Sequence, residues 1–140
     1  IEVSLRVEAG ISWTLDGNAT YTRGEQQVAG MGMEPADRIP PLSGRVGMTF
    51  DPGSAYTIEA WASFSADQSR LSNRDIRDSR IDPEGTPGWA SFAARATWKP
   101  TADWVLALTF SNMLDARYRV HGSGIDAVGQ NLMLSARWSW

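Results

Sequence analysis

Apolar and polar residues alternate with a period of two along most of the chain. In residues 1–9 every odd position is apolar, whereas the even positions carry Glu2, Ser4, Arg6 and Glu8. The same alternation recurs in six further runs, near residues 13–23, 42–50, 56–65, 90–98, 104–111 and 131–140. Because successive side chains of a β-strand point to opposite faces, this pattern predicts seven half-apolar strands. Their length of about 9–12 residues suits a membrane-crossing strand better than the shorter strands of soluble domains.

The connections between these runs alternate between short and long. Short turns fall at residues 10–12, 51–54 and 99–103, and long polar segments fall at residues 24–41, 67–88 and 112–129. Antiparallel strands with short turns at one end and long loops at the other are the layout of outer-membrane barrels. We therefore predict an all-β fold in which the strands belong to an antiparallel transmembrane β-barrel.

The charged residues of the predicted strands all occupy the polar positions of the alternation. They are Glu2, Arg6, Glu8, Asp16, Arg45, Glu59, Arg95 and Arg137. A charge that faces lipid at the membrane midplane costs about 2–4 kcal/mol. This distribution therefore favours a lipid-facing side for the apolar positions and a lumen-facing side for the polar ones.

Aromatic residues at the apolar positions gather at the two ends of the predicted strands. Those beside the short turns are expected to form an aromatic girdle and are Trp13, Phe50, Tyr56, Trp98 and Trp104. Those toward the long loops are Tyr21, Phe64, Phe92 and Phe110. Two such girdles flank the apolar band of membrane barrels. Trp61 and Trp89 occupy polar positions instead, and we expect them to fill the lumen or to lie near a loop.

The number of predicted strands is odd, whereas single-chain bacterial barrels use even numbers. An unpaired strand edge is not tolerated in lipid, so a neighbouring strand is needed on each side. We therefore expect residues 1–140 to form the C-terminal portion of a larger barrel. The chain has no cysteine, which excludes disulfides and thiolate sites, and its net charge of −3 argues against nucleic-acid binding.

Three segments resemble the C-terminal end of TonB-dependent outer-membrane receptors. They are RIPPLSGRVGM at 38–48, GTPGW at 85–89 and NMLDARYRVHGSGIDAVGQN at 112–131. In that family an asparagine, a hydrophobic pair, an aspartate and a tyrosine follow the penultimate strand, and here these are Asn112, Met113, Leu114, Asp115 and Tyr118. The final strand of the family ends on an aromatic residue, which here is Trp140.

The resemblance implies a barrel of about 22 strands in the bacterial outer membrane, plugged by an N-terminal domain. Such a receptor imports a siderophore, haem, cobalamin or glycan with energy from TonB. The implied partners are outer-membrane lipid and lipopolysaccharide, the remainder of the barrel and its plug, TonB through that plug, and the barrel-assembly machinery. We expect no plug domain within residues 1–140. The predicted barrel-assembly signal consists of Leu132, Leu134, Trp138 and Trp140.

Candidate ligand-binding residues lie in the long loops. The second loop contains four arginines, Arg70, Arg74, Arg77 and Arg80, interleaved with acidic residues. It is either an anion-binding or lipopolysaccharide-contacting loop or a solvated loop that neutralises its own charge. His121 is the sole histidine, and it is either a ligand contact or a packed residue of a Gly-rich turn. We predict ligand contacts for these five residues, and no catalytic group, metal site or cofactor.

Two other functions are compatible with the same alternating strands. The first is a smaller structural or adhesive outer-membrane barrel that is assembled from several chains. The second is a soluble periplasmic β-domain that binds a carbohydrate, because soluble sandwiches are also built from alternating strands.

Overall fold

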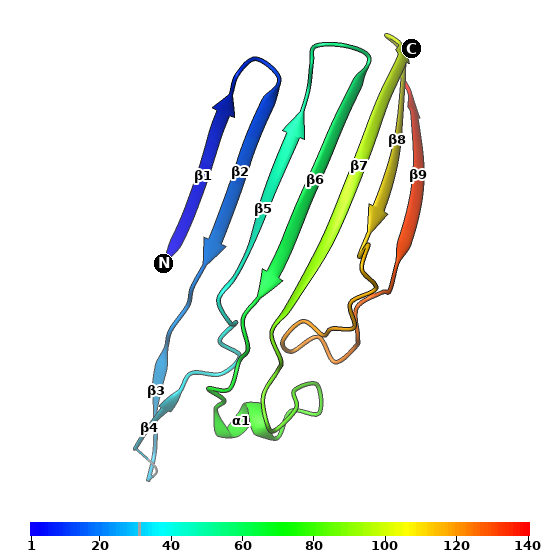
Figure 1. Ribbon diagram of the computed structural model, residues 1–140. Helices are drawn as coiled ribbons and strands as arrows, with labels where there is room; N and C mark the ends of the chain where they lie inside the picture. The colour runs from blue at the N-terminus through cyan, green and yellow to red at the C-terminus, as the bar shows by residue number, and fades with distance from the viewer. Residues whose placement is uncertain (31) are drawn as a thin grey trace.

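Seven antiparallel strands form one continuous sheet in the computed structural model, which describes residues 1–30 and 32–140 (Figure 1). The strands are β1 (Glu2–Ala9), β2 (Trp13–Thr20), β5 (Ser43–Phe50), β6 (Tyr56–Ser65), β7 (Trp89–Thr101), β8 (Trp104–Ser111) and β9 (Asn131–Trp138). Their order in the sheet is their order in the chain. The predicted all-β antiparallel fold and its seven strands are confirmed. Within the described residues β1 and β9 do not pair, so the sheet stays open.

Most strands are shorter than the predicted length. Five of them have 8 residues, while β6 has 10 and β7 has 13. Regular pairing stops where the long loops begin, so residues 21–23 fall outside β2; Tyr21 and Thr22 continue its alternation and Arg23 ends it. Single backbone hydrogen bonds extend the ladder slightly, as from the Tyr21 amide to the Ile1 carbonyl at 2.8 Å.

The long connections carry secondary structure that the alternation did not reveal. In the first, β3 (Glu25–Val28) and β4 (Gly32–Pro35) form a separate hairpin, whose four-residue strands are too short to show a period. In the second, α1 (Asn73–Ile76) begins at a capping box. The Ser72 side chain accepts a hydrogen bond from the Asp75 amide, and the Asp75 side chain accepts one from the Ser72 amide. The sequence S-x-x-D was the available signal for this helix start.

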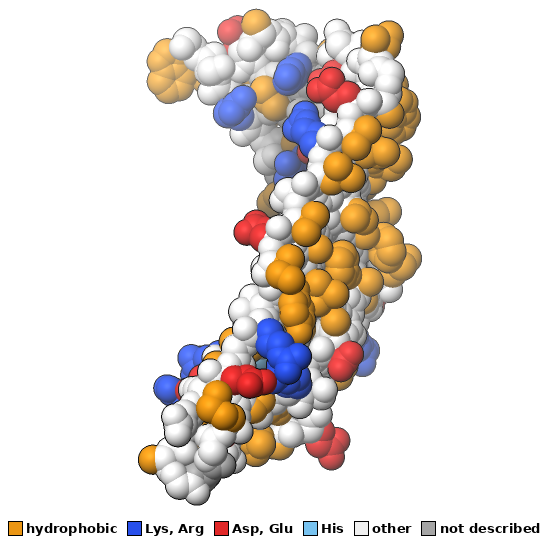
Figure 2. Space-filling model, turned by 90° about the vertical axis from the view of Figure 1, so that its left-hand side faces the viewer, with side chains coloured by type: hydrophobic (Ala, Val, Ile, Leu, Met, Phe, Trp, Pro, Cys, Tyr) orange, Lys and Arg blue, Asp and Glu red, His pale blue; other side chains and the backbone are white. Residues whose placement is uncertain are grey.

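The strand register places the two sets of alternating residues on opposite faces of the whole sheet. On one face Arg6 lies opposite Asp16 and Glu59 lies opposite Arg95. On the other face apolar residues face each other, as Leu108 does with Leu134. Figure 2 shows hydrophobic side chains gathered along the convex side of the curved sheet. The prediction that the strand charges share one face is confirmed.

The convex face is not covered by any other part of the described chain. Leu5 is 65% exposed and Leu134 is 75% exposed. Among the described residues only Ile81 and Ala93 are buried hydrophobics, so the sheet has no core of its own. A wall whose apolar side faces lipid needs none, because the lipid takes the place of a core. No helix within residues 1–30 and 32–140 is long and apolar enough to cross a membrane.

Candidate functional site

Three long connections gather at one end of the sheet, opposite the short turns (Figure 1). We name them loop A (residues 21–42), loop B (residues 66–88) and loop C (residues 112–130). Loop ends of a rigid β-scaffold are common places for binding residues. The contacts that shape these loops therefore define the candidate site.

Loop C is closed at its base by Asn112. This residue is only 4% exposed, and its side-chain nitrogen donates to the carbonyls of Ala116 at 2.9 Å and Val128 at 3.0 Å. Its side-chain oxygen accepts a hydrogen bond from the Ala116 amide at 2.9 Å. Asn112 has a φ of 49°, a left-handed conformation that asparagine tolerates better than most residues. One side chain thus joins the beginning of the loop to its end.

Two further residues of the family-like element hold loop C, one within the loop and one against the sheet. The Asp115 carboxylate, at a φ of 52°, accepts a hydrogen bond from the Gln130 amide at 3.1 Å. The Tyr118 ring stacks on Trp89 with centroids 4.1 Å apart. Trp89 therefore lies near a loop, as one of the two expectations for it stated. The asparagine and aspartate of the element therefore close the loop at its base, and the tyrosine holds it against β7.

Loops A and B are joined by a group of four residues that we call the loop latch: Asp37, Arg38, Ser72 and Asp75. The Asp75 side chain is 1% exposed and accepts hydrogen bonds from the backbone amides of Arg38 at 3.0 Å and Ser72 at 3.2 Å. The Ser72 hydroxyl donates to Asp37 at 2.8 Å. Because each buried polar group has a partner, the latch makes the two loops one unit.

Ion pairs surround the loop latch. Hydrogen bonds from Ser72 and Gln26, followed by the Arg74 guanidinium, hold the pKa of Asp37 below its usual range. Hydrogen bonds from Arg80 hold the pKa of Asp78 well below its usual range, with a smaller contribution from Arg38. Both carboxylates therefore stay ionised in mildly acidic surroundings, and the pairs persist there.

Three of the four arginines predicted to contact a ligand form ion pairs within the loops, and the fourth does not. Arg70 pairs with Glu25 at 3.2 Å, Arg74 with Asp37 at 3.2 Å and Arg80 with Asp78 at 2.7 Å. These contacts match a loop that neutralises its own charge. Arg77 is exposed and forms no ion pair with any described residue. A ligand role for the four remains a prediction.

His121 connects loop C to loop B. Its Nδ1 lies 2.8 Å from the Thr86 hydroxyl, and its Nε2 is buried without a partner among the described residues. Burial lowers the pKa of His121 below its usual value, although the negative charge of Asp75 acts in the opposite direction. The imidazole is therefore neutral near pH 7. The contact with Thr86 gives His121 a structural role, and a ligand contact of this residue remains a prediction.

A cleft of about 340 Å³ lies between loops B and C, and we call it the outer cleft. Its lining includes Arg80, Thr86, Arg117, Tyr118, Arg119 and Asp126. Arg119 is paired with Asp126 at 2.7 Å, whereas Arg117 is exposed and has no ion pair within the described chain. Our sequence analysis missed Arg117 and Arg119. The signal was the R-Y-R triplet around Tyr118, a residue of the family-like element.

The short-turn end of the convex face carries the predicted aromatic girdle. The rings of Trp13 and Phe50 lie 4.7 Å apart, and those of Tyr56 and Trp98 are stacked at 6.2 Å. Trp104 stacks on Trp138, which in turn contacts Trp140. These contacts bring the girdle residues together with Trp138 and Trp140 of the predicted assembly signal at one rim, whereas Leu132 and Leu134 lie further along β9 toward the loops. Their membrane and assembly roles remain predictions.

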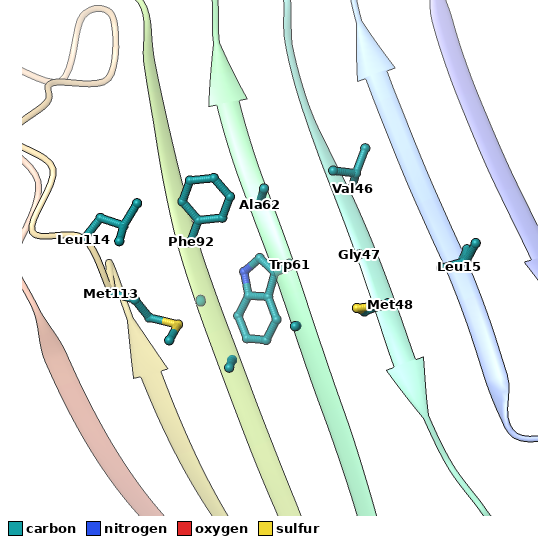
Figure 3. Close-up of a pocket in the computed structure, with 12 residues that line it drawn as sticks. Leu15, Val46, Gly47, Met48, Trp61, Ala62, Phe92, Met113 and Leu114 are labelled. Atoms are coloured by element: carbon teal, nitrogen blue, oxygen red, sulfur yellow. The ribbon is translucent and has the colours of Figure 1, made fainter.

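Between this rim and the loops, the convex face has a shallow apolar groove of about 650 Å³. Figure 3 shows Leu15, Val46 and Met48 on one side of it, and Phe92, Met113 and Leu114 on the other. Small side chains, Ala60, Ala62 and Ala94, lie between the two sides. The groove fits the predicted contact with lipid chains, because its lining offers almost only hydrocarbon.

Residues 1–113 match the family model of the TonB-dependent receptor-like β-barrel, and the chain therefore belongs to this family. The barrels of this family are outer-membrane proteins of Gram-negative bacteria, and they are receptors rather than enzymes. The predicted resemblance is thereby confirmed. The same membership argues against the soluble periplasmic domain considered above.

Solved structures agree on the fold. The chain is similar to the copper transporter OprC, with a TM-score of 0.86 and 18% identity over 99% of this chain and 22% of that one. It is similar to the siderophore receptor PiuA from Acinetobacter baumannii, with a TM-score of 0.65 and 17% identity over 98% of this chain and 21% of that one. It is also similar to the ferric-catecholate import receptor Fiu from Escherichia coli K12, with a TM-score of 0.71 and 16% identity over 98% and 20% of the two chains.

The chain spans about a fifth of the length of each of these solved structures. A comparison with curated protein sequences returned no match.

Proposed function

We propose that residues 1–140 form the C-terminal wall strands and extracellular loops of a TonB-dependent receptor that imports a scarce nutrient across the outer membrane. The observation that carries this proposal is the outer cleft. Loops B and C enclose this cleft, and the guanidinium groups of Arg80, Arg117 and Arg119 line it. Arg117 forms no ion pair with any described residue. Such a cleft suits the capture of a ligand that carries negative charge or many acceptor oxygens.

The ligand belongs to the siderophore, haem, cobalamin or glycan classes. Arginine-lined surroundings favour an anionic chelate among them, because guanidinium groups bind oxyanions through paired hydrogen bonds. The similar solved structures include a siderophore receptor and a ferric-catecholate import receptor, which supports an anionic chelate, and also a copper transporter. Arg80 lines the cleft and His121 bonds to Thr86 beside it, whereas Arg70, Arg74 and Arg77 are proposed as contacts at its periphery.

The convex face, the concave face and the two edges of the sheet indicate the remaining partners of the chain. Lipid and lipopolysaccharide contact the convex face, and the rest of a barrel of about 22 strands continues from its two edges. A plug domain fills the lumen and relays contact with TonB. The barrel-assembly machinery recognises the final strand by its side chains Leu132, Leu134, Trp138 and Trp140. No catalytic step is assigned to this chain.

Uptake by whole cells tests the proposal. The full-length receptor containing residues 1–140 is expressed in a strain that lacks its own related receptors. Cells are offered radio-iron-loaded catecholate and hydroxamate chelates, haem and cobalamin, with and without TonB. We expect TonB-dependent accumulation of at least one of these, and a drop of roughly tenfold or more in the double variant Arg117→Gln/Arg119→Gln, because two charged hydrogen-bond donors are lost.

Arg23→Gln is the matched control, because it removes one exposed guanidinium from loop A, outside the cleft. We expect it to leave uptake unchanged. Accumulation that does not depend on TonB, for every compound offered, contradicts the proposed function. Uptake that falls in the control but not in the double variant contradicts the assignment of the ligand to the outer cleft.

A further inference from the structure

The shallow apolar groove on the convex face follows strand β6, and we call it the convex groove (Figure 3). Ala60 and Ala62 occupy two successive convex positions of β6. In the strand register the direct neighbours of Ala62 are Val46 of β5 and Phe92 of β7, whose side chains are larger. The groove exists because the two small side chains leave the space between these larger neighbours unfilled.

The wall of the groove at the loop end is not made by the sheet alone. Met113 and Leu114 of loop C contribute to it, although strand β8 ends at Ser111. The Met113 amide donates to the Phe92 carbonyl at 2.9 Å, which holds this part of the loop beside β7. Leu114 is 71% exposed, so the described chain leaves most of this side chain uncovered. The base of loop C therefore presents apolar side chains to the occupant of the groove.

The same stretch of chain closes loop C. The Gln130 side chain donates to the Met113 carbonyl at 2.8 Å, and the Gln130 amide donates to the Asp115 carboxylate at 3.1 Å. The Asp115 amide donates to the Asn112 carbonyl at 2.9 Å. A movement of Met113 and Leu114 away from the groove therefore breaks hydrogen bonds that join the beginning of the loop to its end.

The groove extends into the half of the sheet that lies nearer the loops. Along β7, Phe92 lies six positions from Trp98 of the aromatic girdle. At about 3.3 Å per residue and a tilt of about 40°, Phe92 lies about 15 Å from the girdle along the membrane normal, past the midpoint of an apolar band of about 25 Å. In an outer-membrane barrel the long loops face outward, so this part of the groove faces the outer leaflet.

The lining of the groove selects hydrocarbon as its occupant. The charged residues of the strands lie on the opposite face, and a polar segment in the groove would lose its hydrogen bonds to water without replacement. Because Ala60 and Ala62 follow one another along β6, the open path runs along the strand and suits a straight, saturated chain. Lipopolysaccharide, the lipid of the outer leaflet, carries saturated acyl chains.

We propose that the convex groove binds one saturated acyl chain of lipopolysaccharide, and that this chain holds the base of loop C against β7 through its contacts with Met113 and Leu114. A chain that fills the groove gains many dispersion contacts, which a disordered lipid surface does not supply. Lifting Leu114 out of the hydrocarbon exposes it to water, so the chain and the loop stabilise each other. The consequence for ligand capture in the outer cleft, which loop C helps to enclose, rests on the proposed function.

Hydrogen exchange of the full-length receptor in nanodiscs tests the proposal. The receptor is placed in discs of phospholipid alone, or of the same phospholipid with lipopolysaccharide added. Exchange is followed by mass spectrometry in peptides covering residues 113–130. We expect lipopolysaccharide to slow this exchange roughly tenfold, because contacts with the acyl chain must break before the loop opens.

Ala62→Phe places a ring in the groove and excludes the acyl chain. We expect added lipopolysaccharide to change loop C exchange in this variant by less than about twofold. Leu114→Ser removes the apolar contact of the loop, and exchange is expected to stay fast with or without lipopolysaccharide. Ala136→Phe is the matched control, because it adds the same ring at a convex position of β9 outside the groove, and we expect it to respond like wild type.

Several outcomes overturn the proposal. One is equal exchange of residues 113–130 with and without lipopolysaccharide in wild type. Another is an equal response of Ala62→Phe and Ala136→Phe. Discs of phospholipid with saturated chains identify the source of the chain, and protection as strong as that by lipopolysaccharide contradicts the assignment to lipopolysaccharide. If a second copy of the receptor covers the groove, Ala62→Phe lowers the number of receptors per disc and lipopolysaccharide has no effect, which also overturns it.

This proposal and the proposed function fail separately. Protection of loop C by lipopolysaccharide without any TonB-dependent uptake contradicts the proposed function and leaves the convex groove standing. TonB-dependent uptake by a receptor whose loop C does not respond to lipopolysaccharide contradicts the convex groove alone.

Discussion

Replacing Asn112 is expected to open loop C while leaving the sheet intact. Asn112→Ala removes three hydrogen bonds, two donated to carbonyls and one accepted from the Ala116 amide. At about 1 kcal/mol each, their loss costs about 3 kcal/mol. The φ of 49° adds a further cost, up to about 1–2 kcal/mol, because alanine lacks the short polar side chain that lets asparagine adopt the left-handed region.

Asn112→Gly separates the two contributions, since glycine adopts a positive φ without that penalty. It loses the same hydrogen bonds, so its cost is close to 3 kcal/mol. Hydrogen exchange followed by mass spectrometry on peptides covering residues 113–130 measures the effect in the membrane-embedded receptor. We expect exchange to be faster by roughly a hundredfold in the glycine variant and by a further several-fold in the alanine variant.

Peptides from β7 and β8 serve as internal controls and are expected to keep their protection. Unchanged exchange of residues 113–130 in both variants contradicts the role of Asn112 as the base of the loop. Equal exchange in the two variants contradicts the backbone contribution. Faster exchange throughout the sheet shows that the residue supports the wall rather than the loop.

Three further perturbations test other parts of the structure. In Gly44→Ala the added Cβ meets a β2 carbonyl oxygen at 2.3 Å, whereas in Gly17→Ala its nearest contact is 3.5 Å away. Heat-modifiable gel migration is expected to show less folded barrel for the first variant only, and equal migration refutes the steric argument. Leu134→Arg places a charge on the convex face and Met133→Arg places one on the concave face. The first is expected to destabilise the folded barrel by about 2–4 kcal/mol more in denaturant titrations, and equal midpoints contradict the lipid-facing assignment. Because burial lowers the pKa of His121, the folded state prefers the neutral imidazole. That preference is fully present above the ordinary pKa of about 6.5 and is lost as pH falls below it. After correction for the slower intrinsic amide exchange at lower pH, protection factors in loop C are therefore expected to fall from pH 7 to pH 5, and a fall that survives in His121→Gln contradicts this origin.

Asp37 and Asp78 do not account for such an effect in this pH range. Hydrogen bonds from Ser72 and from Arg80 lower the pKa values of Asp37 and Asp78, respectively. Their stabilising contribution is present above the ordinary aspartate pKa of about 3.9 and is lost only as pH falls below it. The interval from pH 7 to pH 5 thus separates the contribution of His121 from those of Asp37 and Asp78.

The strand alternation alone determined the wall of this protein. Its period of two depends only on which residues follow one another, and each hairpin joins neighbours in the chain. For that reason the order of the strands, the face of every strand charge and the gathering of the girdle at the short turns could be predicted. The four-residue strands and helix of loops A and B are too short to carry a period, so they were not.

The candidate sites were decided by the tertiary structure. Asp75 meets the amide of Arg38 across 37 residues of sequence. Met113 and Leu114 reach the convex groove only because the Met113 amide bonds to the Phe92 carbonyl of β7. Loops B and C enclose the outer cleft because Asn112 and the pair of Trp89 with Tyr118 hold loop C against the sheet. The amino-acid composition of loop B does not tell which charges lie close enough to pair. The arginine-rich sequence therefore suggested a ligand surface, whereas in the structure three of its arginines form ion pairs.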